Sequence, residues 1–248
     1  MAGGSKDELL FGKHPVLEAL QAGRMLEKVF LQKGLNVPEV KQIGQLCRQR
    51  LIPVQYVPIQ KLNSISRKIH QGVIAYASLI DYYEIDDIVA QVYDNGEVPL
   101  FLLLDGVTDV RNMGAIARTA LCMGAHALIL PQKGGAIINA DAMKASAGAL
   151  NKLSVCRVRE LQDAMDNLSQ HGIKVAAAAV DGEVILKELD FNIPLGILLG
   201  SEGDGVDEKL MDKADSSFQI PMSGDFDSLN VSVSVGLILY ECLRQRTA

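Results

Sequence analysis

The sequence predicts an α/β protein in which a small α/β unit precedes a larger domain built on a parallel sheet. Between residues 99 and 246, apolar runs of strand length alternate with segments of helix length. The apolar runs lack the apolar–polar alternation of a half-exposed sheet, so we expect strands covered on both faces. The 248 residues, 48% of them hydrophobic, can bury a large core in one big domain or two smaller ones.

The first part of the chain, residues 1–80, is expected to fold as the smaller domain. Its amphipathic segments predict helices at 14–22 and 37–50, and its apolar segments predict strands at 28–32, 53–57 and 72–79. Residues 81–97 are acidic and end in Asp-Asn-Gly, a turn signal, so they are interpreted as a linker with a short helix.

Residues 98–248 form the larger predicted domain. Strands are expected at 99–104, 126–130, 154–158, 174–180, 195–199 and 216–220. Helices are expected at 113–123, 139–150, 160–171, 206–213 and 229–245. In such sheets ligands bind beyond the carboxyl ends of the strands, so the loops after the strands are expected to carry the chemistry.

Several classes of protein are disfavoured by composition. No apolar run reaches the length of a membrane span, and the first residues lack the apolar core of a signal peptide, which makes the cytoplasm the expected location. The cysteines are interpreted as reduced thiols of the core, and neither they nor the scattered histidines show metal-ligand spacing. These cysteines are Cys47, Cys122, Cys156 and Cys242.

The charge of the chain is unevenly distributed. The net charge is −6, but residues 1–78 hold 11 basic and 5 acidic residues, whereas residues 79–248 hold 13 and 25. A basic first third is the asymmetry expected if one domain contacts a phosphate backbone and the other has a different task. Chance clustering of surface lysines is the alternative.

The first candidate loop runs from Leu104 to Thr119, from the end of a strand into a helix that begins near Asn112. Asn112, Ala115 and Arg118–Thr119 recur at spacings of three and four, which favours one helical face. A glycine in the first turn, Gly114, lowers helix propensity and is therefore expected to permit close backbone approach. The alternative is an ordinary capped helix with Arg118 in solvent.

The second candidate loop, from Gly196 to Val206, places glycines after a buried strand in the order G-x-x-G-x-G. This order matches neither the dinucleotide-binding nor the P-loop pattern. Acidic Glu202 and Asp204 would repel phosphates but could accept hydrogen bonds from hydroxyl or ammonium groups. A flexible turn without a ligand is the alternative interpretation.

The third candidate loop leads from Ile220 into the last helix. The stretch Asp227–Ser232 looks like a helix start, because Asp and Ser are good caps, yet Asn230 and Val231 are poor helix formers. Departures from local rules of this kind concentrate at functional sites.

Together these segments resemble the three signature motifs of the SpoU (TrmH-type) branch of the SPOUT RNA methyltransferases. The matching motifs are Asn112-x-Gly114-x-x-x-Arg118, Gly200-Ser201-Glu202-Gly203, and Ile220-Pro221-Met222 with Ser228-Leu229-Asn230-Val231-Ser232. Their order and spacing agree over residues 99–246. Phe11-Gly12-Lys13-His14-Pro15-Val16 and His70-Gln71-Gly72-Val73 resemble the RNA substrate-binding domain of two-domain members. Val110 stands where the family often has proline, which affects turn rigidity more than chemistry.

The resemblance implies a parallel sheet whose C-terminal part is tied in a deep trefoil knot, a topology that pattern alone would exclude. It also implies S-adenosylmethionine, bent and bound in the knot, as the methyl donor. By position, Gly200, Ile220 and Leu229 would contact this cofactor.

The reaction that the resemblance implies is attack of a ribose 2′-hydroxyl on the methyl group. Arg118 is the activator by position, but an arginine stays protonated at neutral pH and is a poor base, so it would instead stabilise the developing alkoxide or fix the neighbouring phosphate. Asn112 and Asn230 would hold the ribose and Arg118, with Ser228 and Glu202 completing the network. The family pattern places the site across a homodimer interface, so the expected partners are RNA and a second copy of the chain, with no membrane and no metal.

The basic first domain would then bind RNA phosphates. The candidates are Arg24, Lys28, Lys33, Arg48, Arg50, Lys61, Arg67 and Lys68. The resemblance is strongest to enzymes that methylate a guanosine of large-subunit (23S) ribosomal RNA. Two alternatives stay open: a transfer RNA 2′-O-methyltransferase of the same family, and a non-catalytic RNA-binding protein that has kept the fold.

Overall fold

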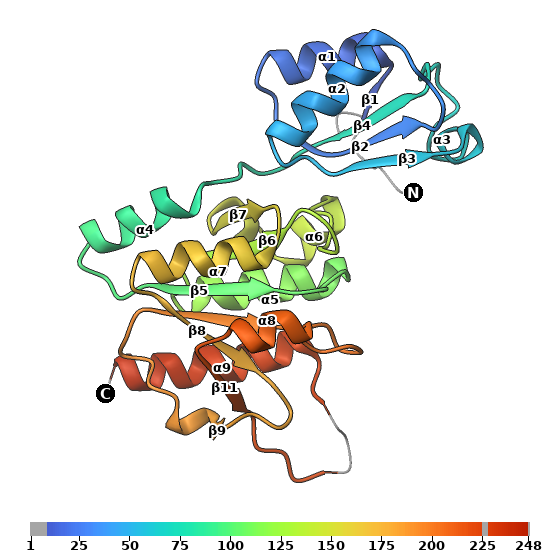
Figure 1. The fold of residues 1–248 in the computed structure, drawn as a ribbon. Coiled ribbons are helices and arrows are strands. Elements are labelled where there is room, and N and C mark those ends of the chain that lie inside the picture. Colours follow the sequence, from blue (N-terminus) through green and yellow to red (C-terminus); the bar gives the residue numbers. More distant parts are fainter. Residues whose placement is uncertain (1–8, 225–227, 248) are drawn as a thin grey trace. The chain divides into compact units, whose positions relative to one another are not determined.

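The computed structural model describes residues 9–224 and 228–247 and divides the chain into two compact units (Figure 1). The N-terminal unit comprises Met1–Asp81 with Ile137–Ala140, and the C-terminal unit comprises Tyr82–Ala136 with Asp141–Ala248. None of the helices in the described ranges is long and apolar enough to cross a bilayer.

The N-terminal unit is a four-stranded sheet in the order β1-β4-β2-β3, in which only the β2–β3 pair is parallel. Its elements are β1 Leu9–Phe11, α1 Lys13–Gln21, β2 Leu26–Gln32, α2 Pro38–Gln49, β3 Val54–Val57, α3 Ile59–Ile65 and β4 Val73–Ala77. Buried residues of α1 and α2, such as Leu20 and Ile43, form one core with Val29 and Val73 of the sheet. The predicted strands and helices of this unit are present, and β1 and α3 are additions.

The C-terminal unit is a seven-stranded sheet in the order β7-β6-β5-β10-β8-β11-β9, and its strand pairings are parallel, as predicted. Its strands are β5 Leu100–Leu104, β6 Ala127–Pro131, β7 Ser154–Val158, β8 Lys174–Ala178, β9 Val184–Ile185, β10 Leu195–Leu199 and β11 Ser216–Gln219. Its α-helices are α4 Ile85–Asp94, α5 Val110–Cys122, α6 Ala140–Ala145, α7 Leu161–Gln170, α8 Glu208–Lys213 and α9 Val231–Arg246. Short 3-10 helices lie at Ala149–Asn151 and Leu186–Glu188.

The segment expected to be a linker differs from that expectation. Residues Ile85, Ile88, Val89 and Val92 of α4 are buried and belong to the same core cluster as Leu161 and Leu168 of α7 and Phe101 of β5. The physical reason is their i, i+3, i+4, i+7 spacing, which gathers the apolar residues on one face while the acidic residues stay outside.

Two further expectations are corrected. The helix expected at 139–150 ends at Ala145, because Ala147 and Gly148 adopt positive φ values of 50° and 85° that no α-helix contains. Cys122 is exposed, whereas Cys47, Cys156 and Cys242 are buried as expected. Burial raises the pKa of the Cys47 and Cys156 thiols to about 12, so both remain protonated and unreactive at neutral pH.

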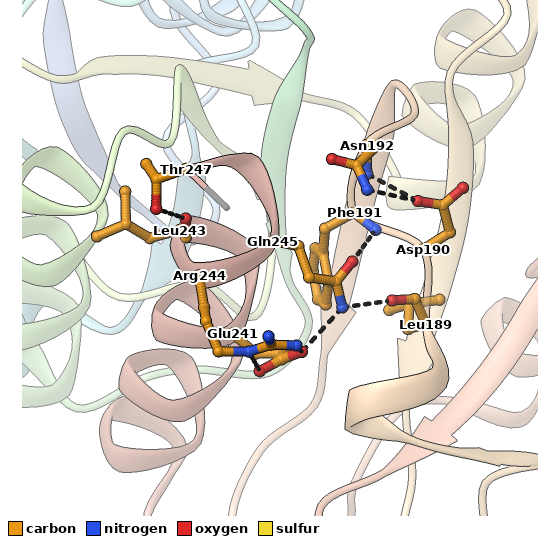
Figure 2. A network of polar contacts seen from close by, with 9 residues as sticks. All are labelled: Leu189, Asp190, Phe191, Asn192, Glu241, Leu243, Arg244, Gln245 and Thr247. Atoms are coloured by element: carbon orange, nitrogen blue, oxygen red, sulfur yellow. Dashed lines mark hydrogen bonds and ion pairs between the residues drawn. The ribbon is translucent and has the colours of Figure 1, made fainter.

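The last helix, α9, is anchored at its C-terminal end by the polar network of Figure 2. The Gln245 side chain donates to the carbonyl oxygen of Leu189 (3.0 Å) and accepts from the amide of Phe191 (3.0 Å). Gln245 also donates to Glu241, which accepts two hydrogen bonds from Arg244. The end of α9 is thereby fixed to the loop that precedes β10.

Candidate active site

The first two candidate loops meet at the carboxyl edge of the seven-stranded sheet because β5 and β10 are neighbouring parallel strands, and the third loop follows β11 of the same parallel sheet. Leu104 and Leu199, the last residues of the two strands, are paired. Beyond them the amide of Asp105 donates to the carbonyl oxygen of Leu199 (2.8 Å), and the Asp105 carboxylate accepts from the amide of Asp207 (2.9 Å). The loop after each strand is therefore held against the other, as the switch-point rule for such sheets requires.

Helix α5 begins three residues earlier than predicted. The Asp109 carboxylate caps it by accepting from the Arg111 amide (2.7 Å), and this hydrogen bond lowers the pKa of Asp109. Asn112 therefore lies in the first turn. Gly114 lies against α6, since a Cβ at this position would be 2.4 Å from the Cβ of Ala145. The expected close approach at Gly114 is confirmed.

The loop after β10 is a closed turn. The amide of Ser201 donates to the carbonyl oxygen of Gly205 at 3.1 Å, and the amide of Gly205 donates to the carbonyl oxygen of Ser201 at the same distance. A Cβ at Gly200 would lie 1.9 Å from the carbonyl carbon of Gly205, so only glycine allows the turn to close. Glu202 is exposed within this turn.

Helix α9 begins with Asn230 as its cap. The Asn230 side-chain oxygen accepts from the amide of Ser232 (2.9 Å). Ser228 and Leu229 precede the helix, and Asp227 lies outside the described residues. A side-chain cap at Asn230 explains how a helix can open on residues of poor helix propensity.

The cap also joins the three motifs into one network. The Asn230 amide group donates to the side-chain oxygen of Asn112 (3.1 Å) and to the Oε1 atom of Glu202. The Asn112 amide group donates to the same Oε1 atom at 2.7 Å. Three predicted site residues, separated by up to 118 positions in sequence, are therefore in direct contact.

A cavity of about 300 Å³ opens beside this network. It is lined by all three predicted cofactor residues, Gly200, Ile220 and Leu229, and by the predicted Glu202 and Ser228. Its wall also contains residues outside the three segments, namely Ala178, Ala179, Val180, Asp181 and Met211. Ala178 ends β8 and residues 179–181 follow it, and β8 is a neighbour of β10, so the strand-end rule could have found them. The small apolar side chains of Ala178, Ala179 and Val180 gave no chemical signal.

The charge of the cavity restricts its ligand. The described lining includes the carboxylates of Asp181, Glu202 and Asp204 but no lysine or arginine. An acidic wall beside apolar residues suits a ligand with a positive charge and a flat apolar group, and it disfavours phosphates.

Arg118 lies apart from the network. It is exposed on α5, and the described part of the chain provides it with no hydrogen bond or ion pair. Six residues separate it from Asn112, which on an α-helix corresponds to about 120° around the axis. Arg118 and Asn112 therefore point in different directions from the same helix, and the expectation that they share one helical face is wrong.

Comparison with known proteins identifies the family. The model of the SpoU rRNA methylase family matches residues 99–240, and a model described as RNA 2′-O ribose methyltransferase substrate binding matches residues 9–83. Bacillus subtilis YacO, whose name places it among TrmH family tRNA/rRNA methyltransferases, is 34% identical over 239 residues and covers 96% of each chain. A Staphylococcus haemolyticus protein of the same description is 34% identical over 97% of each chain.

Solved structures agree in fold and indicate the cofactor. The Streptomyces viridochromogenes SpoU methyltransferase AviRb, solved with S-adenosylmethionine, matches 96% of this chain and 90% of its own with a TM-score of 0.62 and 25% identity. A Sinorhizobium meliloti rRNA methyltransferase with the same ligand matches 96% and 87% with a TM-score of 0.60 and 25% identity. With both family models matched and its relatives aligned over nearly their full length, the chain belongs to the SpoU (TrmH) family of RNA methyltransferases, which use S-adenosylmethionine.

Proposed function

We propose that this enzyme methylates a ribose 2′-hydroxyl of RNA, at a guanosine of 23S ribosomal RNA in the cytoplasm. The observation that carries the proposal is the Asn112–Glu202–Asn230 network, because it unites all three motifs beside a cavity suited to the methyl donor. Amide groups of this kind can hold a ribose hydroxyl by donating and accepting hydrogen bonds.

The cavity fits the cofactor in size and chemistry. Its volume of about 300 Å³ is at the small end for ligand sites, which suits a folded rather than an extended cofactor. Gly200 offers an unobstructed backbone, and Ile220 and Leu229 offer apolar surface to an adenine ring. When bound, the cofactor supplies the methyl group on a positively charged sulfonium, which the carboxylates of Glu202 and Asp181 complement.

In this proposal the protein positions the reactants and stabilises charge. Asn112 and Asn230 hold the ribose, and Ser228, at the cavity wall, contributes a further hydroxyl. Arg118 acts on the ribose from outside the network, where its guanidinium stabilises the alkoxide that develops as the hydroxyl loses its proton.

We further propose that the enzyme is an obligate homodimer. Val233, Leu237 and Tyr240 of α9 are 50%, 42% and 61% exposed, and their i, i+4, i+7 spacing puts them on one side of the helix. Such an apolar stripe favours a second copy of α9 as its cover. A dimer would also give Arg118, which has no partner within the described chain, a cofactor to reach in the other subunit. A monomer with full activity at matched concentrations in sedimentation would refute the dimer.

Two observations favour ribosomal RNA over transfer RNA. The Sinorhizobium meliloti rRNA methyltransferase matches 96% of this chain, whereas the Aquifex aeolicus tRNA modifying enzyme, 28% identical with a TM-score of 0.56, matches only 65%. Residues 1–78 hold 11 basic and 5 acidic residues, and this excess of positive charge suits a dedicated RNA-binding domain. We also propose the trefoil knot of the C-terminal unit, with which the position of β10 between β5 and β8 is compatible.

The decisive experiment is to map 2′-O-methylation across total RNA from a strain that lacks this gene. We expect one ribose of 23S ribosomal RNA to lose its methyl group, and the wild-type gene to restore it. Arg118→Ala should fail to restore it while binding S-adenosylmethionine with unchanged affinity in calorimetry.

Other outcomes separate the alternatives. Loss of a methyl group from transfer RNA would replace the proposed substrate. Unchanged methylation, together with no cofactor binding at millimolar concentration, would favour the non-catalytic RNA-binding protein.

A further inference from the structure

The loop that joins α3 to β4 presents an unusual side chain. Ile69 is 88% exposed, more than any other large hydrophobic residue in the described ranges. Arg67 and Lys68, which precede it, are exposed as well. An isolated exposed apolar side chain needs no explanation by itself, but this one stands on a loop whose base is firmly built.

The base of the loop is fixed by His70, which is only 6% exposed. Its Nδ1 atom accepts from the amide of Gly72 (3.1 Å), so its Nε2–H group donates to the Asn63 side chain of α3 at 2.9 Å. The carbonyl oxygen of His70 accepts from the amide of Val73 (2.8 Å), which closes a turn into β4. The buried ring therefore ties both ends of the loop together.

The turn itself has a special backbone. Gln71 and Gly72 have φ values of 48° and 79°, and a Cβ at Gly72 would lie 2.6 Å from a methyl group of Leu35. Positive φ at a non-glycine residue is uncommon, and such backbone conformations cluster at functional sites. The carbonyl oxygen of Gly72 also accepts from the amide of Gln32 (2.8 Å), which brings exposed Lys33 to the same edge of the sheet.

The stretch of chain that contains the loop carries charge of one sign. Residues 40–80 contain six basic residues and no Asp or Glu. Glu39, the acid that immediately precedes this stretch, is already paired with Lys13 at 2.8 Å. The ammonium group of Lys68 lies 4.9 Å from the centroid of the Phe11 ring, which holds the lysine at the sheet surface. Phosphates are the partner that the adjacent charges of Arg67 and Lys68, with no acid in this stretch, favour.

Resting on the RNA methyltransferase function proposed above, we infer that residues 67–69 recognise an unpaired region of the RNA. Arg67 and Lys68 bind backbone phosphates, and Ile69 packs against an unstacked base. Specific RNA recognition mostly targets single-stranded loops, whose exposed bases accept apolar or stacking contacts. A paired A-form helix offers no comparable surface to Ile69, because its bases are stacked.

The test uses the full-length enzyme and two labelled RNA probes, a hairpin with a randomised seven-nucleotide loop and a fully paired duplex of the same length. Fluorescence anisotropy measures the affinity of both at several salt concentrations. Ile69→Ser should weaken hairpin binding by about fivefold to tenfold and leave duplex binding unchanged. Ile69→Leu should retain wild-type affinity, because it keeps an apolar side chain of equal size.

The charge contribution is tested separately. The double variant Arg67→Gln with Lys68→Gln should lower the slope of log affinity against log salt by roughly 1.4, since each phosphate contact on single strands contributes about 0.7. Lys41→Gln, which removes an exposed charge from α2 of the same unit, should leave the slope unchanged.

The outcomes distinguish this inference from the proposed function. If the wild-type enzyme binds the hairpin and Ile69→Ser binds it equally well, residues 67–69 do not read unpaired RNA and the inference fails alone. If Ile69→Ser weakens duplex and hairpin alike, the contact is not to an unpaired base and the inference also fails. If the wild-type enzyme binds neither RNA probe and methylates no RNA, the proposed function fails together with this inference.

Discussion

The two ends of α9 carry polar networks of similar size but different construction. At the N-terminal end, Asn230 contacts Asn112 and Glu202 through side chains alone. At the C-terminal end, Gln245 bonds to backbone groups of Leu189 and Phe191 (Figure 2). The first network joins segments that are distant in sequence at a cavity; the second satisfies the backbone of a neighbouring loop.

This difference separates a functional network from a structural one. Backbone groups that leave water need partners, so the Gln245 contacts have a clear role in stability. The side chains of the Asn230 network are solvent-accessible and could bond to water instead, so holding them together adds little to folding. Their arrangement supports the proposal that they bind the substrate.

The largest effect is expected from Gly200→Ala, which disrupts the turn that carries Glu202. The added methyl group would lie within 1.9–2.2 Å of the backbone of Gly205 and Val206. We therefore expect the unfolding free energy to fall by about 3 kcal/mol, and we expect cofactor binding to be lost. Gly203→Ala is the matched control, because a Cβ at that position would have nothing within 4 Å. Urea denaturation and calorimetry would measure both, and equal behaviour of the two variants would contradict the close packing.

Next in size is the effect of Glu202→Ala on catalysis. Removing the shared acceptor of Asn112 and Asn230 should lower kcat/KM by roughly 100-fold, equivalent to about 2.7 kcal/mol, with unfolding unchanged. Glu202→Gln keeps an oxygen acceptor and should lose less activity. Methyl transfer to RNA measures the first effect. Strong destabilisation by Glu202→Ala would instead show that this network stabilises the fold.

Gln245→Leu should show the opposite pattern. It leaves the amide of Phe191 and the carbonyl oxygen of Leu189 without their side-chain partner, so we expect a loss of about 1–2 kcal/mol of stability and unchanged activity per folded molecule. Gln170→Leu, at the exposed end of α7, is the control and should cost much less. If Gln245→Leu lost activity without losing stability, the structural role assigned to the Gln245 network would be wrong.

The smallest effect concerns pH. Hydrogen bonds from Arg244 and Gln245 lower the pKa of Glu241 to about 2, from an unperturbed value of 4.5. Because the folded pKa is depressed, the stabilisation is complete above pH 4.5 and is lost as the pH falls towards 2. Solvent screening limits it to less than about 1 kcal/mol. The difference in unfolding free energy between wild type and Glu241→Gln should shrink between pH 5 and pH 3, and added salt should reduce it at pH 5.

The sequence predicted the regular elements well where periodicity was strong. The strand expected at 195–199 appears unchanged, because a continuous apolar run between turn residues has one clear interpretation. The short helix expected within residues 81–97 is present as α4, but its burial was missed because the acidic run was given more weight than the apolar spacing of Ile85, Ile88, Val89 and Val92. The positive φ of Ala147 could not be predicted, since alanine has no preference for that conformation.

The candidate site was predictable in its residues but not in its connections. Glycine and polar residues after strands located Asn112, Glu202 and Asn230, and the neighbouring strands β5 and β10 explain why the first two meet. Their individual hydrogen bonds depend on the cap at Asn230, which the sequence placed only within a six-residue stretch. The roles of Arg118 and of Gly200, Ile220 and Leu229 stay predictions, of which Arg118→Ala and Gly200→Ala test two.

The guanidinium of Arg246 imposes an order of events on the newly made chain. It donates to the carbonyl oxygens of Val98 and Pro99, which directly precede β5, and to those of Phe191 and Ile193, which precede β10. Strand β10, at the centre of the sheet, and Arg246 are translated long after β5. The large sheet can therefore gain its central strand and these hydrogen bonds only when synthesis is nearly over. The N-terminal unit, apart from residues 137–140, is complete by Asp81. An RNA-binding unit can thus emerge and fold on the ribosome while the catalytic unit is still unfinished.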